Sequence, residues 1–270
     1  MTTKNELALL LKVARETAVS AGKQARAIIE QPRTITDKGH GDIATDADFA
    51  AQTLIIDTIL AQFPHHGFLA EEENAPYPTK GPIIWIVDPL DGTQNYNRRQ
   101  PEFAVSVAAA RPLPNNQFQP LAGAIYDPMR DELFSAASGM GAFINNHPIT
   151  VSAIHQIKQS VLAVDWSYNP SLGASMLNYA LSLGKAVKSL RALGSAALCL
   201  AWVAAGRYDA YINFHLKPWD IAAAVVIVEE AGGKVTHLDG CPLQWHKSGL
   251  DCLFSNGRVH TQYLQHLHHS

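Results

Sequence analysis

Two carboxylates, Asp88 and Asp91, stand three positions apart just after the apolar run 83–87. The run predicts a strand buried on both faces of a sheet. Residues three apart on a straight strand point to opposite faces, so we expect Pro89 to break the pairing and turn the chain until both carboxylates converge. Converging carboxylates repel each other without a cation between them, and Mg²⁺ prefers such oxygen ligands. The pattern predicts a magnesium site, although an ordinary strand-to-turn exit has the same residues.

Gly92 and Thr93 complete this segment. A glycine lets the backbone approach a ligand closely, and the free N–H groups at a following helix start can bind an anionic phosphate. Magnesium often binds one or two carboxylates together with substrate phosphate oxygens. The segment therefore favours phosphate chemistry.

Three more acidic groups lie at expected strand ends or helix starts. Glu71 and Glu72 follow a predicted strand at 67–70, Asp48 stands three residues after Thr45, and Asp220 opens the last predicted helix. Each has a plain alternative: a solvated acidic loop in the first case, and helix capping in the other two. Four acidic groups in such places point jointly to a phosphate site with more than one metal ion.

Composition narrows the classes of function. The chain has 270 residues, 47% of them hydrophobic, and a formal net charge of −3. It has no basic run, so direct nucleic-acid binding is not expected. Three cysteines without C-x-x-C spacing favour a reducing cytoplasm. No signal peptide or membrane span is expected. The histidines near the C-terminus favour a solvated helix end over a metal site.

Hydrophobic periodicity predicts which elements position these residues. The pattern of the first half predicts an amphipathic helix, a second helix and a set of antiparallel strands, and Thr3 with Glu6 forms a capping box before the first helix. We expect helices at 7–29 and 47–63, strands at 67–70, 83–87, 103–110, 121–126 and 132–136, and a hairpin turn at Asn145-Asn146.

The second half alternates strands with helices, as in a parallel α/β sheet. Gly232-Gly233 should end the last helix, because glycine adopts left-handed dihedrals readily. We expect strands at 161–165, 186–190 and 208–212, and helices at 172–183, 196–205 and 219–231. The prediction is two α/β lobes, 1–150 and 151–270, in one compact unit.

Four segments of the chain resemble the inositol monophosphatase family. They are K-x-x-x-D-x-x-T-x-x-D from Lys38, the pair Glu71-Glu72, W-I-V-D-P-L-D-G-T-x-N-Y from Trp85, and K-P-W-D-I-A-A-A-x-x-I-V-E-E-A-G-G from Lys217. They occur in the family's order and span residues 38–233. The resemblance implies an αβαβα sandwich, a homodimer, and magnesium-dependent, lithium-sensitive hydrolysis of phosphate monoesters.

The same resemblance implies a set of metal ligands. Glu71 and Asp88, with the backbone carbonyl of Leu90, would bind the first Mg²⁺, and Asp88, Asp91 and Asp220 would bind the second. Two or three ions per site are expected. One cation would acidify the attacking water and the other would screen the phosphate and the departing alkoxide.

The family resemblance also implies catalytic and substrate-binding roles for individual residues. Glu71 and Thr93 would position the water, Asp48 would orient Thr93, and Lys38 and Glu72 would lie beside the metals. Backbone N–H groups would hold the phosphate, while Ser195 and Ala196 would line the alcohol pocket. The implied substrate-binding set is Asp91, Gly92, Thr93, Ser195, Ala196, Asn213 and Asp220.

One departure from the family concerns the substrate. Inositol-specific members carry a glutamate where this chain has Asn213, which offers one acceptor and two donors but no charge. Inositol-1-phosphate or a similar small polyol phosphate remains the expected substrate. The alternatives are histidinol phosphate, fructose-1,6-bisphosphate or a nucleotide 3′-phosphate. A different class of function also stays open: a regulatory protein on the same fold that binds partners such as the transcription machinery.

Overall fold

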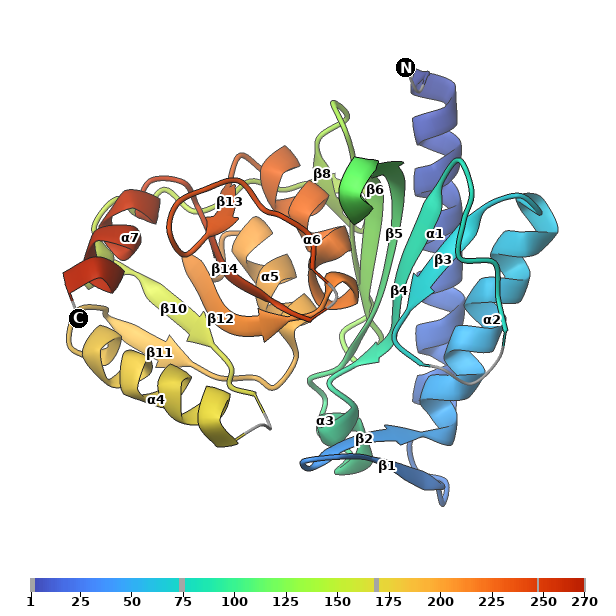
Figure 1. The fold of residues 1–270 in the computed structure, drawn as a ribbon, viewed down its shortest axis with the longest axis horizontal. Coiled ribbons are helices and arrows are strands. Elements are labelled where there is room, and N and C mark those ends of the chain that lie inside the picture. The colour runs from blue at the N-terminus through green and yellow to red at the C-terminus, as the bar shows by residue number, and fades with distance from the viewer. Residues whose placement is uncertain (1–2, 73–75, 168–169, 247, 270) are drawn as a thin grey trace.

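Five alternating layers of helices and sheets make up the molecule (Figure 1). The computed structural model describes residues 3–72, 76–167, 170–246 and 248–269. A helical layer, a seven-stranded sheet, a second helical layer, a five-stranded sheet and a third helical layer follow one another. This arrangement confirms the predicted layered αβαβα fold.

The first half of the chain builds the seven-stranded sheet and its outer helices, with strand order β3-β4-β5-β6-β7-β8-β9. Among the described residues of this sheet, only β3 and β4 pair in parallel; the other pairs are antiparallel, as expected. The elements are α1 (Lys4–Ala27), β1 (Ile35–Gly39), β2 (Asp42–Thr45), α2 (Asp46–Gln62), β3 (Gly67–Ala70), β4 (Ile84–Asp91), α3 (Thr93–Asn97), β5 (Ala104–Leu113), β6 (Gln117–Asp127), β7 (Glu132–Ala137), β8 (Ala142–Ile144) and β9 (His147–Pro148).

The second half forms the five-stranded sheet, with strand order β11-β10-β12-β14-β13, and four helices around it. The strands β10, β11 and β12 are parallel, and β14 pairs antiparallel with both of its neighbours. The elements are β10 (Val161–Val164), α4 (Pro170–Gly184), β11 (Ser189–Arg191), α5 (Ala196–Ala204), β12 (Ala210–Leu216), α6 (Pro218–Glu230), β13 (Lys234–His237), β14 (Leu250–Ser255) and α7 (His260–His269).

Alternation of side chains along the strands explains the layering. On β4, Trp85 packs into the core shared with α1 and α2, whereas Ile86 packs into the core shared with α5 and α6. On β12, Tyr211 faces α5 and α6, whereas Ile212 faces α4 and α7. Since successive strand residues point to opposite faces, each sheet contributes to two cores. The helices α5 and α6 are therefore buried between the sheets.

Close packing fixes α6 against the seven-stranded sheet. A Cβ on Gly123 of β6 would lie 2.7 Å from the Cα of Ala223 on α6, which is closer than real Cβ contacts. Only a glycine permits this approach. It sets the position of α6, whose first turn carries Asp220.

Most predicted helix and strand positions are confirmed within a few residues. The Thr3–Glu6 capping box is present, Thr45 caps α2, and Gly232 adopts φ 87° just after α6. Whether 1–150 and 151–270 are separate lobes stays a prediction. Their proposed boundary falls between β9 and β10, and one core contains residues from both sides of it.

The antiparallel hairpin of β1 and β2 at residues 35–45 was not predicted. The strand β4 runs through Pro89 to Asp91, and its register with β5 shifts between Asp88 and Asp91, in agreement with the predicted interruption of pairing. One local expectation was wrong. His260 is fully buried, with its ring nitrogens hydrogen-bonded to Ser255 Oγ and Thr236 Oγ1, so this member of the C-terminal histidines is not solvated.

Candidate active site

A cleft of about 280 Å³ collects most of the predicted site residues. It lies where β4 ends, beside α3 and the β1–β2 hairpin, which appear together at the bottom centre of Figure 1. Ten of the predicted residues line it: Lys38, Glu71, Asp88, Leu90, Asp91, Gly92, Thr93, Ala196, Asn213 and Asp220. Asp48, Glu72 and Ser195 are not among the lining residues; all three are buried.

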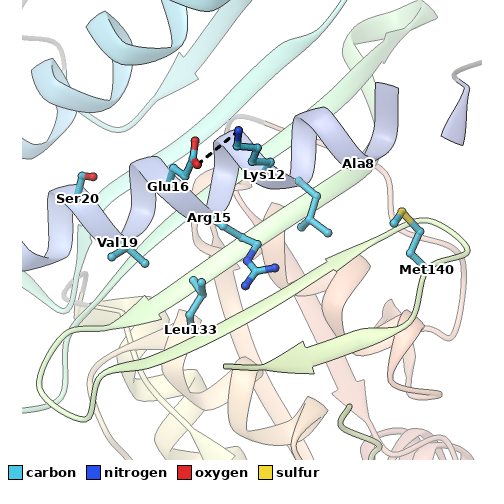
Figure 2. Close-up of a pocket in the computed structure, with 9 residues that line it drawn as sticks. Ala8, Lys12, Arg15, Glu16, Val19, Ser20, Leu133 and Met140 are labelled. Atoms are coloured by element: carbon cyan, nitrogen blue, oxygen red, sulfur yellow. Dashed lines mark ion pairs between the residues drawn. The ribbon is translucent and has the colours of Figure 1, made fainter. Parts of the chain in front are cut away.

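A larger hollow of about 520 Å³ lies elsewhere, between α1 and the turn after β7 (Figure 2). Its described lining is largely apolar, and its one acidic residue, Glu16, pairs with Lys12 at 3.9 Å. Arg15 donates there to Asn146 Oδ1. These residues do not provide the acidic chemistry expected from the sequence, so the smaller cleft is the candidate active site.

The bulge in β4 lets Asp88 and Asp91 serve one cleft. Asp88 is buried and accepts the Leu90 N–H at 3.0 Å, a bond that closes the tight turn around Pro89. Burial is the largest cause that raises the pKa of Asp88 well above its usual range, and the charges of Glu71, Asp91 and Asp220 raise it further. Repulsion among these acids shows that they share one electrostatic environment.

Asp91 is held by the start of α5. Its carboxylate accepts the N–H groups of Ala196 at 3.2 Å and Ala197 at 2.9 Å, and it also accepts the Ser195 hydroxyl. Burial raises the pKa of Asp91 to about 7, although the bonds from Ser195 and Ala197 oppose that rise. Ser195 thus contacts a predicted metal ligand from behind the cleft wall, while Ala196 lines the cleft itself.

Asp220 comes from the opposite side, on the first turn of α6. It accepts the Lys217 N–H at 2.7 Å, so it also closes the N-terminus of its own helix. Burial raises the pKa of Asp220 well above its usual range, followed by the charges of Glu71 and Asp91. The helix-capping interpretation from sequence is therefore correct, and it coexists with a place in the acidic cleft.

Glu71 and Glu72 meet Lys38 across the cleft. The Lys38 ammonium lies 2.7 Å from Glu71 Oε1 and 2.9 Å from Glu72 Oε1. Glu72 is 3% exposed, which excludes a solvated loop for that residue. Burial raises its pKa to about 7. Gln52 of α2 holds the Glu72 peptide at both ends, because its side chain accepts the Glu72 N–H at 3.0 Å and donates to the Glu72 carbonyl at 2.5 Å.

Thr93 and Asp48 form a directed pair. The Thr93 hydroxyl lies 2.8 Å from Asp48 Oδ1 and 3.0 Å from the Leu90 carbonyl oxygen. The other oxygen of Asp48 accepts the N–H and the hydroxyl of Thr45. Burial raises the pKa of Asp48 to about 6, against the lowering effect of these bonds. Asp48 is therefore placed to orient Thr93, in addition to capping α2.

Asp165 and Trp166 also line the cleft, and neither was predicted from the sequence. Asp165 accepts the Gly194 N–H at 2.8 Å and lies 3.3 Å from the Tyr211 hydroxyl, which in turn accepts from Asn213 Nδ2 at 2.9 Å. A signal was available, because Asp165 directly follows an apolar strand as Asp88 does. Gln52 was also missed, and a lone glutamine inside a helix carries no such signal.

The donor set suits a hard divalent cation by its chemistry. Carboxylate oxygens of Glu71, Asp88, Asp91 and Asp220 and the Leu90 carbonyl line one cleft. In the described part of the chain, no three His, Cys, Asp or Glu side chains are already grouped as around a bound metal ion. Two of these carboxylates already have partners. Glu71 forms an ion pair with Lys38, and Asp91 accepts a hydrogen bond from the N–H of Ala197 at the start of α5. A cation would therefore bind with some rearrangement, and it would relieve the repulsion that raises these pKa values.

The layered fold and this acidic cleft define a class of protein. The model of the inositol monophosphatase family matches residues 6–270, and the chain belongs to this family. The predicted resemblance is thereby confirmed. Membership supports a phosphatase, and it implies a small phosphorylated substrate.

Individual relatives are similar along nearly the whole chain. An inositol-1-monophosphatase of Synechocystis sp. is 35% identical over 266 residues, 97% of this chain and 90% of the relative. The Nus factor SuhB of Escherichia coli K12 is 36% identical over 234 residues, 86% of each chain. A crystal structure of the extragenic suppressor protein suhB from Bartonella henselae superposes with a TM-score of 0.87 at 32% identity, covering 96% of this chain and 98% of that one.

The solved structures also include an inositol monophosphatase from Anabaena, with a TM-score of 0.84 at 36% identity, covering 97% of this chain and 96% of that one. No helix in the described ranges is both long and apolar enough to cross a membrane.

Proposed function

We propose that the chain is a magnesium-dependent phosphatase that hydrolyses a small phosphate monoester, with inositol-1-phosphate as the first candidate. The observation that carries this proposal is the convergence of Glu71, Asp88, Asp91 and Asp220 on one cleft beside Gly92 and Thr93. The proposal includes two or three Mg²⁺ ions per site, a homodimer and a cytoplasmic location. Lithium sensitivity follows from the family resemblance.

In this proposal the residues divide the chemistry between them. Magnesium would be held by Glu71, Asp88, Asp91, Asp220 and the Leu90 carbonyl, and when bound it would supply positive charge that acidifies water and screens the phosphate. The Thr93 hydroxyl has one hydrogen and two acceptors in reach, Asp48 Oδ1 and the Leu90 carbonyl; whichever accepts it, a lone pair of Thr93 Oγ is available to accept an O–H of the attacking water. The Glu71 carboxylate accepts the proton that this water loses. The water oxygen bonds phosphorus as the bond to the alcohol oxygen breaks. The alcohol oxygen keeps the bonding electron pair and takes up a proton from bulk water, and no phosphoenzyme is required.

The phosphate is placed by the backbone around Gly92. This residue has φ 92°, and a Cβ there would lie 2.8 Å from the Glu102 carbonyl oxygen. A side chain would thus be both strained and crowded, whereas glycine leaves the N–H groups of residues 92 and 93 able to approach an anion. The alcohol part of the substrate would then extend toward Ala196 and Asn213.

Phosphate release from inositol-1-phosphate, with and without Mg²⁺, tests the proposal. The same assay includes histidinol phosphate, fructose-1,6-bisphosphate and a nucleotide 3′-phosphate, so that the fastest substrate identifies the branch of the family. Release that requires Mg²⁺ supports the function. Folded protein that releases phosphate from none of these substrates would contradict it.

Thr93→Val is expected to lower kcat about 10²-fold with little change in KM. The substitution preserves shape but removes the hydroxyl that we assign to the attacking water, and positioned groups of this kind contribute roughly this much. Steady-state kinetics at saturating Mg²⁺ measures the effect. Thr53→Val is the matched control, because Thr53 donates to the Phe49 carbonyl on the exposed side of α2. Equal kcat in the two variants would remove Thr93 from the mechanism.

A second role is favoured by one comparison, since a relative 36% identical to this chain is named a Nus factor. We propose this binding role only beside catalysis. Association of purified chain with purified transcription machinery, unchanged by Asp91→Asn, would support it. Association that depends on Asp91 would tie the binding to the active site instead.

A further inference from the structure

One face of α2 contacts the chain at both groups that we assign to the attacking water. Asp48 and Gln52 stand four residues apart on this helix, so their side chains lie on the same face. Both residues are fully buried. Asp48 Oδ1 lies 2.8 Å from the Thr93 hydroxyl, and Gln52 contacts the peptide that directly follows Glu71.

The Gln52 amide takes the place of a neighbouring strand. The strand β3 lies at the edge of its sheet, and its bonding to β4 extends to the Glu71 N–H, which donates to the Val87 carbonyl at 3.1 Å. At Glu72, the Gln52 side chain accepts the N–H at 3.0 Å and donates to the carbonyl at 2.5 Å. These are the two groups through which a residue in an antiparallel sheet bonds its partner. A glutamine amide has the acceptor and the donor that this pairing needs.

The backbone of Glu71 is therefore held from both sides. Its own N–H is bonded to β4, and its carbonyl belongs to the planar peptide whose N–H is bonded to Gln52. The φ and ψ angles of Glu71 are thereby fixed, and with them the direction in which its side chain leaves the chain. This side chain lines the cleft, 2.7 Å from the Lys38 ammonium. Because Mg²⁺ demands near-ideal geometry, the direction of each ligand matters for affinity.

We propose that Gln52 is a positioning residue of the magnesium site and that it acts through Glu71. Together with Asp48 it makes α2 the element that sets the separation between Glu71 and Thr93. The inference rests on the proposed function, because Glu71 is a metal ligand only in that proposal. Residues that orient metal ligands without touching the metal commonly contribute about 10- to 100-fold to metal affinity.

Gln52→Leu tests the inference. Leucine fills a similar volume but leaves the Glu72 N–H and carbonyl without this partner, so the backbone of Glu71 is released. We expect the Kd for Mg²⁺ to rise about 10- to 100-fold. Isothermal titration calorimetry with magnesium chloride, in the absence of any substrate, measures the Kd independently of turnover. If Gln52→Leu does not fold, Gln52→Asn replaces it, because this amide is one methylene shorter and the Kd should rise in the same direction.

Gln117→Leu is the matched control. The Gln117 amide forms the same pair of bonds with another peptide, since it accepts the Trp245 N–H at 2.8 Å and donates to the Trp245 carbonyl at 3.2 Å. Neither residue belongs to the described lining of the active-site cleft. Both leucine variants lose two hydrogen bonds to a peptide, so both should have a lower free energy of unfolding. Only Gln52→Leu should change the Kd for Mg²⁺.

A double variant shows whether Gln52 acts through Glu71. Glu71→Ala removes the ligand itself and should raise the Kd at least as much as Gln52→Leu does. In the Glu71→Ala background, Gln52→Leu should raise the Kd by less than about twofold, because the side chain that it positions is gone. Effects of the two substitutions that add in free energy would show that Gln52 acts elsewhere.

The outcomes separate this inference from the function on which it rests. A Kd in folded Gln52→Leu equal to that of the wild type overturns the positioning role and leaves the phosphatase in place. An equal rise in Gln117→Leu also overturns it, since lost stability would then account for both. A wild type that binds Mg²⁺ with an affinity dependent on Gln52, yet releases no phosphate, supports the positioning role and refutes the function. A wild type that binds no Mg²⁺ refutes both.

Discussion

Asp220→Asn and Asp91→Asn are each expected to lower kcat/KM about 10³-fold, which leaves almost no turnover, while the chain stays folded. Each change removes one negative ligand from the proposed magnesium site. A loss of about 10³-fold corresponds to roughly 4 kcal/mol of transition-state stabilisation, the size found when one preorganised electrostatic group is removed. Phosphate release at saturating Mg²⁺ measures the effect.

The two variants should differ in their effect on the fold. Asp220 accepts the Lys217 N–H, and an asparagine oxygen can accept the same bond. Asp91 accepts backbone N–H groups on both oxygens, so an asparagine NH₂ would face one of these donors. We therefore expect Asp91→Asn to lower the free energy of unfolding, whereas Asp220→Asn should not lower it through a lost hydrogen bond.

Glu229→Gln is the control for this comparison. It removes a carboxylate from the other end of the same helix, α6, where the residue is exposed. Its activity should match that of the wild type. Near-normal turnover in folded Asp91→Asn or Asp220→Asn would instead refute the assignment of that residue as a metal ligand.

Asp88→Asn is expected to stabilise the metal-free protein at pH 8, because it removes a buried charge that its neighbours repel. Asp88 is raised well above its usual pKa by burial and by Glu71, Asp91 and Asp220. The folded state therefore binds a proton that the unfolded state releases near pH 4. Such a group favours the fold at low pH and loses that contribution as pH rises through its folded pKa. Asparagine removes the charge and can still accept the Leu90 N–H.

The advantage of Asp88→Asn should thus be small at pH 5 and grow toward pH 8. The variant must be compared with the wild type at each pH. Burial lowers the pKa of His260 to about 4, so this residue makes the free energy of unfolding rise with pH, opposite to the effect of Asp88. Denaturant unfolding in EDTA measures the difference. Adding Mg²⁺ should stabilise the wild type most at high pH and the variant far less.

Asp57→Asn, an exposed change on α2, should have little effect at any pH. An Asp88→Asn variant that is less stable than the wild type at pH 8 would show that the acidic cleft is not under electrostatic strain.

Much of the fold was predictable because its signals are local. The Thr3–Glu6 capping box, the apolar run before Asp88 and the glycine after α6 each determine their own element, and all three are observed. The β1–β2 hairpin was missed because its exposed, polar strand at 35–39 lacks the alternation of a half-buried strand. The interruption of pairing at Pro89 was predictable, but its partner strand β5 is not revealed by the sequence of β4 alone.

The candidate site was predictable where acids follow buried strands or open helices. The cleft brings together Asp88, Asp91 and Asp220 from positions far apart in the chain, and only a family resemblance could connect them beforehand. Residues that do not line the cleft but hold its lining residues in place were harder to predict. Gln52 holds the Glu72 peptide through contacts between α2 and the loop after β3, and such a contact is a property of the folded chain.

The sharing of one core between the two halves bears on how the protein is made. The strands of the seven-stranded sheet are complete at Pro148, but α5 and α6, which cover one of its faces, end only at Glu230. A ribosome adds about 5–20 residues per second, so this face with Ile86, Ile125 and Phe134 stays uncovered for roughly 4–16 s during synthesis. A nascent chain stalled in this interval should bind chaperones that recognise apolar surfaces. Once α6 has emerged and docked beside Gly123, that affinity should disappear.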